Sequence, residues 1–547
     1  MSHSATSQAG ILAEGLAKCP HAFEPSGFPG FGYLLGPPDE ATGQRSRLGA
    51  DPAEAHRLLL ALSKVLPRGA GFWKAPLTDD NPSIPSGYTY LLQLVAHDAV
   101  QTSVPFWVAA KLGLASRNLR SAPFVLDTLY GGGPTGSAVA YQSGDSSLLL
   151  LGRYKSQVTG IAATAAERPF RDLGRINPVE SADGLVPANF DHPHVTCVAD
   201  DRNDDNIILA QLVALFANVH DAIAKKLRKT QPEASPEAVF GYAQVAMQRI
   251  YHAIIGRDLL PKLLHPQVWA TLVDRAADDP RWLWRTGRMP LEFTHGAFRI
   301  GHAMVRRDYK LNDLGIDPLS VGQTITIGRN VGDSRDPLQQ AWLVRWSRFF
   351  KMQDADTPNL SRRISPTMSA LDVEGVFNVS DGKQPENLAV RDMLSAALAR
   401  TWRVDALLDQ ILAQNQDPIP PGWMFRDGGQ RREVIRGWLT AQGLSDTDSD
   451  TLADDPPLPF FVLLEAALDP EILGRHLGPL ASIIIGEVIW RSVILERQRM
   501  AATECVARAA FKAPFWDEMA AIESMPGLVA FAARHCGFDG AAPMPFA

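Results

Sequence analysis

Cysteine is scarce in this chain, whose 547 residues include only Cys19, Cys197, Cys505 and Cys536. The four lie far apart, and none forms the Cys-x-x-Cys spacing that structural zinc sites and redox motifs use. We therefore expect neither a disulfide framework nor a structural zinc site.

Excess positive charge is also absent. Lys and Arg number 53 against 60 Asp and Glu, which gives a formal net charge of −7. Because phosphate binding needs concentrated Lys and Arg, nucleic acid is not expected as a partner. Hydrophobic residues make up 46% and charged residues 21%. Both values are close to the average of soluble globular proteins and argue against a disordered or fibrous chain.

The sequence shows no secretory leader and no membrane-spanning segment. Residues 1–30 lack a basic stretch followed by an apolar run, so we expect a cytoplasmic protein. The apolar stretch 477–495 is interrupted by Gly, Pro and Ser and by two charged residues, Glu487 and Arg491. This stretch predicts a buried core helix without a membrane span.

Residues 1–50 are rich in Gly, Pro and Ser and predict an extended N-terminal arm. Length alone favours three or four domains, but no linker or change in composition marks a boundary after residue 50. Residues 51–547 therefore predict one large, mainly α-helical domain with long loops and very little β-structure. Apolar periodicity predicts helices over residues 52–66, 88–100, 207–227, 236–264 and 385–413.

Two segments depart from this helical pattern. Residues 321–327 alternate in hydrophobicity and predict a short strand. The acidic run 445–455 predicts a polar loop before the next apolar segment.

Gln93 and His97 lie four residues apart on a predicted helix and therefore share one of its faces. A single histidine on such a helix is usually a core residue bonded to a carbonyl. Arg202 lies in the acidic run 200–206, just before the predicted helix 207–227. Acidic residues at a helix N-terminus complement the helix dipole, and an arginine among them fits a surface ion pair.

Gly301 directly precedes His302 in the run 298–302. Glycine permits a flat group to approach the backbone, and imidazole is a common axial ligand of haem iron. A buried packing histidine is the simpler interpretation of this run alone. Similarly, Arg391 and Asp392 fit the solvent-exposed face of an amphipathic helix.

Taken together and in this order, the runs resemble the peroxidase–cyclooxygenase superfamily, the animal-type haem peroxidases, and its bacterial members in particular. The likeness extends from about residue 80 to about residue 494. The matching motifs are the distal helix (80–98), the calcium loop and turn (126–134), the distal-arginine helix (200–221), the helix that follows (254–264), the proximal motif (298–302) and two closing helices.

This resemblance implies a haem site with a role for each matching residue. His302 is implied as the axial ligand of the iron and His97 as the distal acid–base group. Arg202 corresponds to the distal arginine, and Gln93 to the residue that orients water or a halide. Arg299 corresponds to an arginine near a haem propionate.

Three positions depart from the family pattern. Ala96 replaces the aspartate that esterifies the haem in mammalian members, and Asp205 is one methylene shorter than the usual second ester-forming residue. We therefore expect a non-covalent haem b, with an Asp205 ester as the alternative. Asp392 stands where the family usually places Asn, so it would give His302 more anionic character.

Arg299 occupies the position of the radical-forming tyrosine of cyclooxygenase-like members.

A calcium site is a further implication of the resemblance. Calcium prefers oxygen ligands, which Asp98, Asp127 and the Ser121 hydroxyl would supply. Val125 occupies one position of this loop where an acidic ligand is common.

The activity that the resemblance implies is a haem-dependent peroxidase. Such an enzyme reduces hydrogen peroxide and oxidises a small organic donor or a halide through an oxoferryl species. Two alternatives remain open: an oxygenase of the same fold acting on a fatty acid or biosynthetic intermediate, and a haem-binding relative with little turnover. The donor and the oligomeric state are not determined by the sequence.

Overall fold

The computed structural model describes most of the chain. The described residues are 31–66, 72–104, 116–120, 122–152, 172–176, 195–313, 317–328, 338–352, 358–367, 379–380, 385–386, 388–413 and 419–536. Residues 1–30, the larger part of the predicted arm, lie outside them. The arm and the division of the chain at residue 50 therefore stay predictions.

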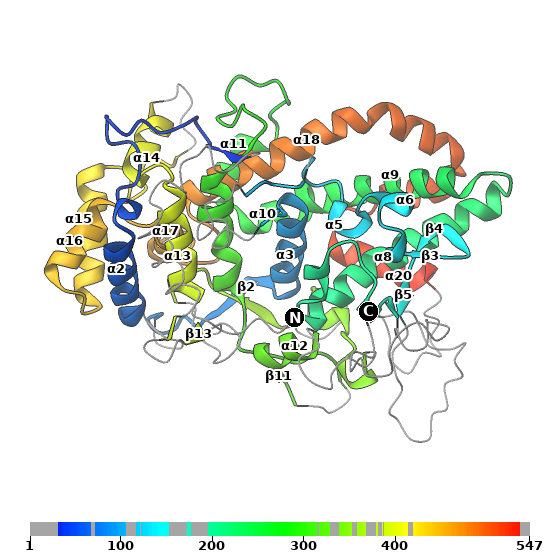
Figure 1. The fold of residues 1–547 in the computed structure, drawn as a ribbon, viewed down its shortest axis with the longest axis horizontal. Coiled ribbons are helices and arrows are strands. Elements are labelled where there is room, and N and C mark those ends of the chain that lie inside the picture. Colours follow the sequence, from blue (N-terminus) through cyan, green and yellow to red (C-terminus); the bar gives the residue numbers. More distant parts are fainter. Residues whose placement is uncertain are drawn as a thin grey trace.

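Helices make up the body of the protein, which confirms the mainly α fold class. The α-helices of the described residues are α2 (Pro52–Val65), α3 (Gly87–Ala99), α5 (Asp127–Tyr130), α6 (Gly133–Gly136), α8 (Ile207–Thr230), α9 (Pro236–Ile254), α10 (Leu260–Leu263), α11 (Pro266–Leu272), α12 (Val321–Gly328), α13 (Leu388–Ala399), α14 (Val404–Leu412), α15 (Gly428–Ala441), α16 (Asp446–Asp454), α17 (Leu458–Leu468), α18 (Pro479–Ala510), α19 (Ala513–Ala520) and α20 (Met525–His535). Figure 1 shows α2, α15 and α16 gathered at one end of the molecule and α3 near its middle, with α18 running above α3 toward the other end.

Strands are short and pair two by two in the described part of the chain. The pairs are β1 (Phe31–Gly32) with β9 (Met289–Pro290), β2 (Asp80–Pro85) with β12 (Leu360–Arg362), β3 (Tyr141–Gln142) with β4 (Asp145–Leu149), β5 (Leu151–Gly152) with β6 (Asp172–Leu173), β7 (Arg175–Ile176) with β8 (Val195–Thr196), β10 (Asp308–Tyr309) with β11 (Leu319–Ser320), and β13 (Val379–Ser380) with β14 (Pro385–Glu386). The β2–β12 pair continues into α3, because the backbone N–H of Ser86 donates to the carbonyl of Asn359 at 2.7 Å. This pairing fixes where α3 begins.

The long helix α8 forms the centre of the core. Asn206 caps its N-terminus, since the side-chain oxygen of Asn206 accepts the backbone N–H of Ile208. By length and composition α8 is apolar enough to cross a membrane, but 94% of its most apolar stretch is buried by neighbouring parts of the protein. The apolar composition of α8 is therefore accounted for by core packing.

The structure confirms four of the predicted helices: α2, α3, α8, and α9 with its continuation into α10. The apolar stretch near the C-terminus is also helical, in α18, and its first four turns are buried. The fifth prediction, a helix over 385–413, is only partly right. Residues 385–386 are a strand, and the helix ends at Ala399 because Arg400 adopts a left-handed φ of 48° before α14 begins.

The predicted strand over 321–327 is wrong, since these residues form α12. The Ser320 hydroxyl accepts the backbone N–H of Gln323 at 3.2 Å, and the Gln323 side-chain oxygen accepts the N–H of Ser320 at 2.8 Å. This reciprocal capping box starts a helix despite the β-branched residues that follow. Val321 and Ile325, four residues apart, then face inward.

The predicted acidic loop over 445–455 is also wrong. Residues Asp446–Asp454 form α16, which Ser445 caps by accepting the backbone N–H of Asp448. Its carboxylates pair with Arg432 and Arg436 of the adjacent α15. These ion pairs remove the like-charge repulsion that the run has when considered alone.

Candidate functional site

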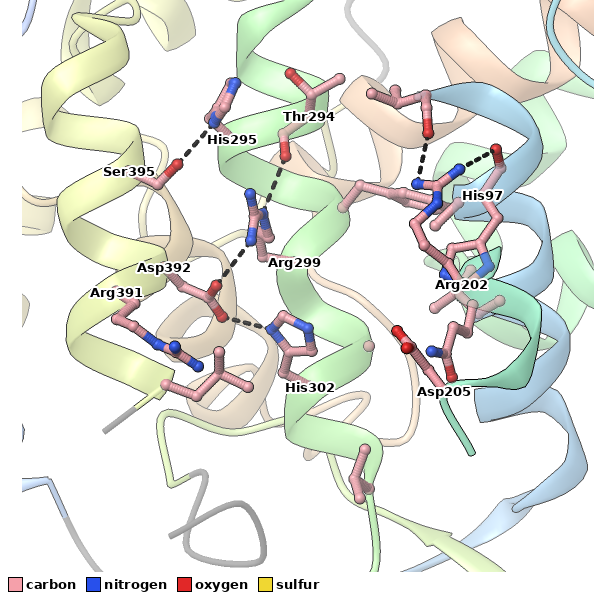
Figure 2. A pocket seen from close by; sticks show the side chains of 18 of the residues that line it. His97, Arg202, Asp205, Thr294, His295, Arg299, His302, Arg391, Asp392 and Ser395 are labelled. Atoms are coloured by element: carbon pink, nitrogen blue, oxygen red, sulfur yellow. Dashed lines mark hydrogen bonds and ion pairs between the residues drawn. The ribbon is translucent and has the colours of Figure 1, made fainter. Parts of the chain in front are cut away.

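One cavity of about 630 Å³ lies between α3, α12, α13 and the segment that carries His302 (Figure 2). Seven predicted site residues line it, although they come from four separate stretches of sequence: Gln93, His97, Arg202, Asp205, Arg299, His302 and Asp392. The other walls are largely apolar and include Leu92, Ala96, Val100, Phe293, Phe298, Val305, Val321, Ile325, Leu388 and Leu398. A mostly apolar cavity with a few converging polar groups is typical of a cofactor or substrate site, and ligand pockets range from about 300 to 1,000 Å³.

The segment that carries His302 changes its helical pitch. A π-helical turn, η7 (Glu292–Gly296), is followed by a 3-10 helix, η8 (Ala297–Met304). Such departures from α geometry are frequent at functional sites. The fully buried Glu292 carboxylate anchors this segment by accepting the backbone N–H groups of Leu34 at 2.9 Å and Trp402 at 3.2 Å.

His302 is held by a carboxylate of α13. Its Nδ1 donates to Asp392 Oδ2 at 2.5 Å, and Arg299 Nη1 donates to the other oxygen, Oδ1, at 3.1 Å. Asp392 is fully buried, so the interpretation that it lies on the solvent-exposed face of an amphipathic helix is wrong. Burial alone would raise the pKa of Asp392, but the charges and hydrogen bond of His302 and Arg299 outweigh it and lower the pKa below its usual value. Figure 2 shows the opposite edge of the His302 ring facing the cavity.

The sequence analysis missed a second histidine, His295 of η7, which pairs with a residue of α13. His295 Nδ1 lies 2.7 Å from the hydroxyl of Ser395, and both residues line the cavity. His295 lies seven positions before His302, or about two helical turns, and this spacing was the available signal. Burial lowers the pKa of His295 to about 3, so its ring is neutral.

His97 is the histidine of the opposite wall, and its neighbours fix its tautomer. Asn203 Nδ2 donates to the carbonyl of Thr128 at 2.8 Å, so Asn203 Oδ1 is the acceptor that faces His97 Nδ1 at 3.1 Å. Nδ1 must therefore carry the proton, and Nε2 of the neutral ring keeps its lone pair. Burial, followed by the charge of Arg202, lowers the pKa of His97 to about 4.

The guanidinium of Arg202 is fixed in the wall of the cavity by four hydrogen bonds. Its Nε and Nη2 donate to the two oxygens of Asp200 at 2.9 and 2.6 Å. Nη1 donates to the carbonyl of Val100 at 2.8 Å, and Nη2 to that of His97 at 3.0 Å. A guanidinium has five N–H donors. Four are used here among the described residues, which leaves one N–H of Nη1 for a cavity ligand.

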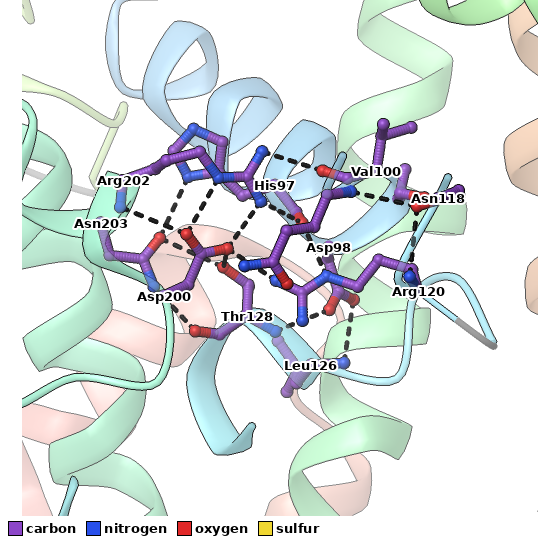
Figure 3. Close-up of polar contacts among 12 residues, drawn as sticks. His97, Asp98, Val100, Asn118, Arg120, Leu126, Thr128, Asp200, Arg202 and Asn203 are labelled. Atoms are coloured by element: carbon purple, nitrogen blue, oxygen red, sulfur yellow. Dashed lines mark hydrogen bonds and ion pairs between the residues drawn. The ribbon is translucent and has the colours of Figure 1, made fainter. Parts of the chain in front are cut away.

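Asp200 holds two guanidinium groups at once (Figure 3). Arg120 Nη2 donates to Asp200 Oδ2 at 2.6 Å, the oxygen that Arg202 also uses, and Arg120 Nε donates to the carbonyl of His97. Asp200 is almost completely buried, so this is no surface ion pair. Two cations on one carboxylate leave a net charge of +1 beside His97, which favours anionic species in this part of the cavity.

Several observations test whether the cavity fits a haem. A Cβ added at Gly301 would meet only Leu92 Cδ2, at 3.4 Å, so this part of the backbone borders free space. The apolar walls suit a porphyrin, and the free edge of His302 suits axial ligation. Arg299 and Arg391 border the same cavity and suit anionic propionates. The residues present therefore fit the group.

Two residues bear on covalent attachment of that group. Ala96 lines the cavity and offers no carboxylate, as the sequence indicated. Asp205 also lines the cavity, and Figure 2 shows its carboxylate directed into the space between His302 and Arg202.

The predicted calcium ligands do not form an assembled site in the described residues. Both carboxylate oxygens of Asp98 accept hydrogen bonds from backbone N–H groups, one from Leu126 at 2.8 Å and the other from Thr128 at 3.1 Å. Ser121 lies outside the described residues, and within them no group of three or more His, Cys, Asp or Glu side chains is placed to hold a metal. Asp98 is a buried residue of α3, and it links that helix to the segment Leu126–Thr128 (Figure 3).

Comparison with known proteins supports the identification of the motifs. The family model described as animal haem peroxidase matches residues 164–353, a range that holds Arg202, Asp205, Arg299 and His302. The chain is 28% identical to lactoperoxidase of Homo sapiens over 177 residues, 30% of this chain and 24% of that protein. It is 26% identical to peroxidase mlt-7 of Caenorhabditis elegans over 211 residues, 38% of this chain and 28% of that protein.

These matches confirm the resemblance to the animal haem peroxidases, although they span only about a quarter of the length of the curated relatives. Among solved structures, peroxidase A from Dictyostelium discoideum matches with a TM-score of 0.52 at 15% identity. The match covers 86% of this chain and 90% of that one. At this identity, the structural match shows a shared fold.

Proposed function

We propose that this relative of the animal haem peroxidases is itself a haem-dependent peroxidase, which reduces hydrogen peroxide and oxidises a small organic donor or a halide. The observation that carries the proposal is the contrast between the two histidines of the cavity. His302 Nδ1 binds a carboxylate, whereas His97 Nδ1 binds a neutral amide. The first arrangement strengthens a metal ligand, and the second preserves a neutral base.

His302 would hold a haem b through Nε2, with Arg299 and Arg391 binding its propionates. The bound haem would supply the iron at which peroxide is reduced. We infer that the haem is not esterified at residue 96, because Ala96 has no carboxylate. An ester at Asp205 is the alternative, since that carboxylate borders the cavity.

The residues of the distal wall would move one proton. His97 Nε2 accepts it from one oxygen of hydrogen peroxide and returns it to the other oxygen, which leaves as water. The free N–H of Arg202 and the net positive charge beside it stabilise the negative charge that builds on the departing oxygen. Gln93, one turn before His97, orients a water molecule or halide.

The test is a pair of variants with different expected losses. Wild-type protein loaded with haem should show a Soret band that His302→Ala removes. His97→Ala should keep the band but react with peroxide about 100-fold or more slowly, the usual scale of general acid–base catalysis. A protein that binds no haem would overturn the proposal. Oxygen uptake with a fatty acid in the absence of peroxide would favour an oxygenase instead.

A further inference from the structure

A chain of aromatic side chains leads away from the cavity. Tyr90 of α3 lines the cavity wall. Its ring centroid lies 5.6 Å from that of Tyr309, which in turn stacks on Phe349 at 6.1 Å. Phe349 is in edge contact with Trp346 at 6.2 Å. All four side chains are buried.

The chain continues from Trp346 to a tyrosine with a base beside it. Trp346 stacks on Phe350 at 5.9 Å, and Phe350 meets Tyr88 edge-on at 5.2 Å. The Tyr88 hydroxyl donates to both oxygens of Asp258, at 2.8 and 2.9 Å.

Asp258 lies in a π-helical turn, η6 (Ile255–Leu259), a geometry frequent at functional sites. It also accepts the backbone N–H of Met525 at 2.8 Å and pairs with Lys262. The Lys262 side chain is 35% exposed, and its ammonium lies 5.1 Å from the centre of the Tyr88 ring. The aromatic chain therefore ends one side chain away from solvent.

This arrangement suits the movement of single electrons. Tyrosine and tryptophan are the aromatic side chains that lose an electron most readily, and the intervening phenylalanines keep the rings in contact. A tyrosine that stays oxidised must release its phenolic proton, and only Tyr88 has a carboxylate within hydrogen-bond distance of its hydroxyl among the tyrosines of this chain of rings. The positive charge of Lys262 favours the neutral, deprotonated radical over a cationic one.

We propose that Tyr88 is a second oxidation site, connected to the cavity through Trp346, Tyr309 and Tyr90, at which one-electron donors too large for the cavity are oxidised. This inference rests on the proposed function, because peroxide acting through the cofactor of the cavity is the oxidant.

The step balances in electrons and protons. One electron would pass inward to the cavity through Trp346, Tyr309 and Tyr90, each of which regains the electron that it gives up and keeps its own proton, while Phe349 and Phe350 are not oxidised. Tyr88 loses one electron, and its O–H bond breaks as the proton passes to Asp258. A phenolic donor at the surface then returns an electron to Tyr88 and releases its own proton to solvent, while Asp258 returns the shared proton to the Tyr88 oxygen.

The experiment uses haem-loaded full-length protein and two readouts. Electron paramagnetic resonance of samples frozen after one equivalent of peroxide measures the tyrosyl radical. Oxidation of a phenol coupled to a large dextran is compared with oxidation of the free phenol. Tyr88→Phe and Tyr309→Phe keep the rings in place, and Tyr141→Phe is the matched control, since Tyr141 is buried outside the chain and donates to the carbonyl of Tyr130.

We expect Tyr88→Phe and Tyr309→Phe each to reduce the dextran-coupled rate at least tenfold and to weaken the tyrosyl signal, with the free phenol rate within twofold of wild type. Tyr141→Phe should match wild type in both readouts. Unchanged dextran rates in Tyr88→Phe or in Tyr309→Phe would overturn the proposal, as would an equal loss in the control. A wild type that shows a Soret band and consumes peroxide, yet never oxidises the dextran-coupled phenol, would overturn the second site alone.

Discussion

His302 and Arg299 share one carboxylate: Nδ1 of His302 lies 2.5 Å from Asp392 Oδ2, and Nη1 of Arg299 lies 3.1 Å from Oδ1. The histidine thus gains anionic character from Asp392, while the arginine withdraws part of it. The balance between the two sets the electron density that the ring can offer to a metal.

Asp392→Asn should raise the Fe(III)/Fe(II) reduction potential of the haem-loaded protein. The amide keeps the shape of the carboxylate but removes its charge, so the ferric state loses stabilisation. Redox titration of the Soret band measures the change. Ser395→Ala is a suitable control, because it removes the α13 hydroxyl that contacts His295 and leaves the contact between His302 and Asp392 in place. An unchanged potential in Asp392→Asn would discard the idea.

Arg299→Gln should shift the same potential in the opposite direction. Loss of the guanidinium leaves Asp392 with less compensation, and it removes a positive charge near the cavity. Both changes stabilise the more oxidised metal. A potential that rises in this variant would show that Arg299 does not act through Asp392.

The reaction with peroxide should lose rate in acid only well below the ordinary histidine range. Burial and Arg202 lower the pKa of His97 from 6.5 to about 4, so the ring stays neutral and basic until the pH approaches about 4. In the unfolded chain the same ring takes up its proton at the higher value. As the pH falls from 6.5 to about 4, the unfolded chain binds a proton at His97 that the folded protein does not, so the free energy of unfolding decreases.

Stopped-flow mixing with peroxide across the pH range measures the acid limb. Arg202→Gln should move this limb to higher pH, because the charge that opposes protonation of His97 is gone while Asp200 remains. A limb already centred at 6.5 in the wild type would contradict the assignment.

Asn203→Ala should slow the peroxide reaction by about 10- to 100-fold, the usual loss when the partner that orients a functional histidine is removed. Without the Asn203 acceptor, His97 is free to hold its proton on Nε2, which then cannot act as a base. Asn203→Asp keeps an acceptor and should recover most of the rate, with the acid limb moved upward by the added negative charge. Equal loss in both variants would indicate damage to the fold, since Asn203 also binds the carbonyl of Thr128.

Ser320→Ala should lower the free energy of unfolding by about 0.5–2 kcal/mol, the range for loss of an N-cap hydroxyl. The hydroxyl accepts the N–H of Gln323 at the start of α12, which supplies Val321 and Ile325 to the cavity wall. Chemical denaturation followed by circular dichroism measures the change. Gln323→Ala leaves the hydroxyl in place and should cost less; the reverse order would argue against the capping box.

The sequence predicted seven residues that line the cavity and the pairing of His302 with Asp392, but not the other partners of these residues. Gln93 and His97 share a face of one helix, and their position on the wall follows from helical periodicity. The Asn203 contact with His97 depends on a backbone carbonyl at Thr128, and no spacing within either motif encodes it. The Ser395 contact with His295 likewise joins residues 100 positions apart.

The secondary-structure predictions were wrong where tertiary contacts override the local preference of the residues. The β-branched residues of α12 favour a strand when considered alone, yet Thr324 lies inside the protein, where its hydroxyl accepts a hydrogen bond from Asn206. The acidic run of α16 avoids self-repulsion through arginines of α15. Propensity is a weak guide in both segments because a neighbouring element supplies the missing interaction.

The walls of the cavity come from α3, the residues just before α8, η8, α12 and α13, which together span about three hundred positions of the chain. No short segment of the chain contains the whole cavity. A ligand of the cavity therefore binds the native state and has essentially no affinity for the unfolded ensemble. By mass action, the thermal midpoint of the protein then depends on the concentration of free occupant. Loading and global folding are therefore one linked equilibrium, and the melting curve becomes a binding assay for whatever this cavity accommodates.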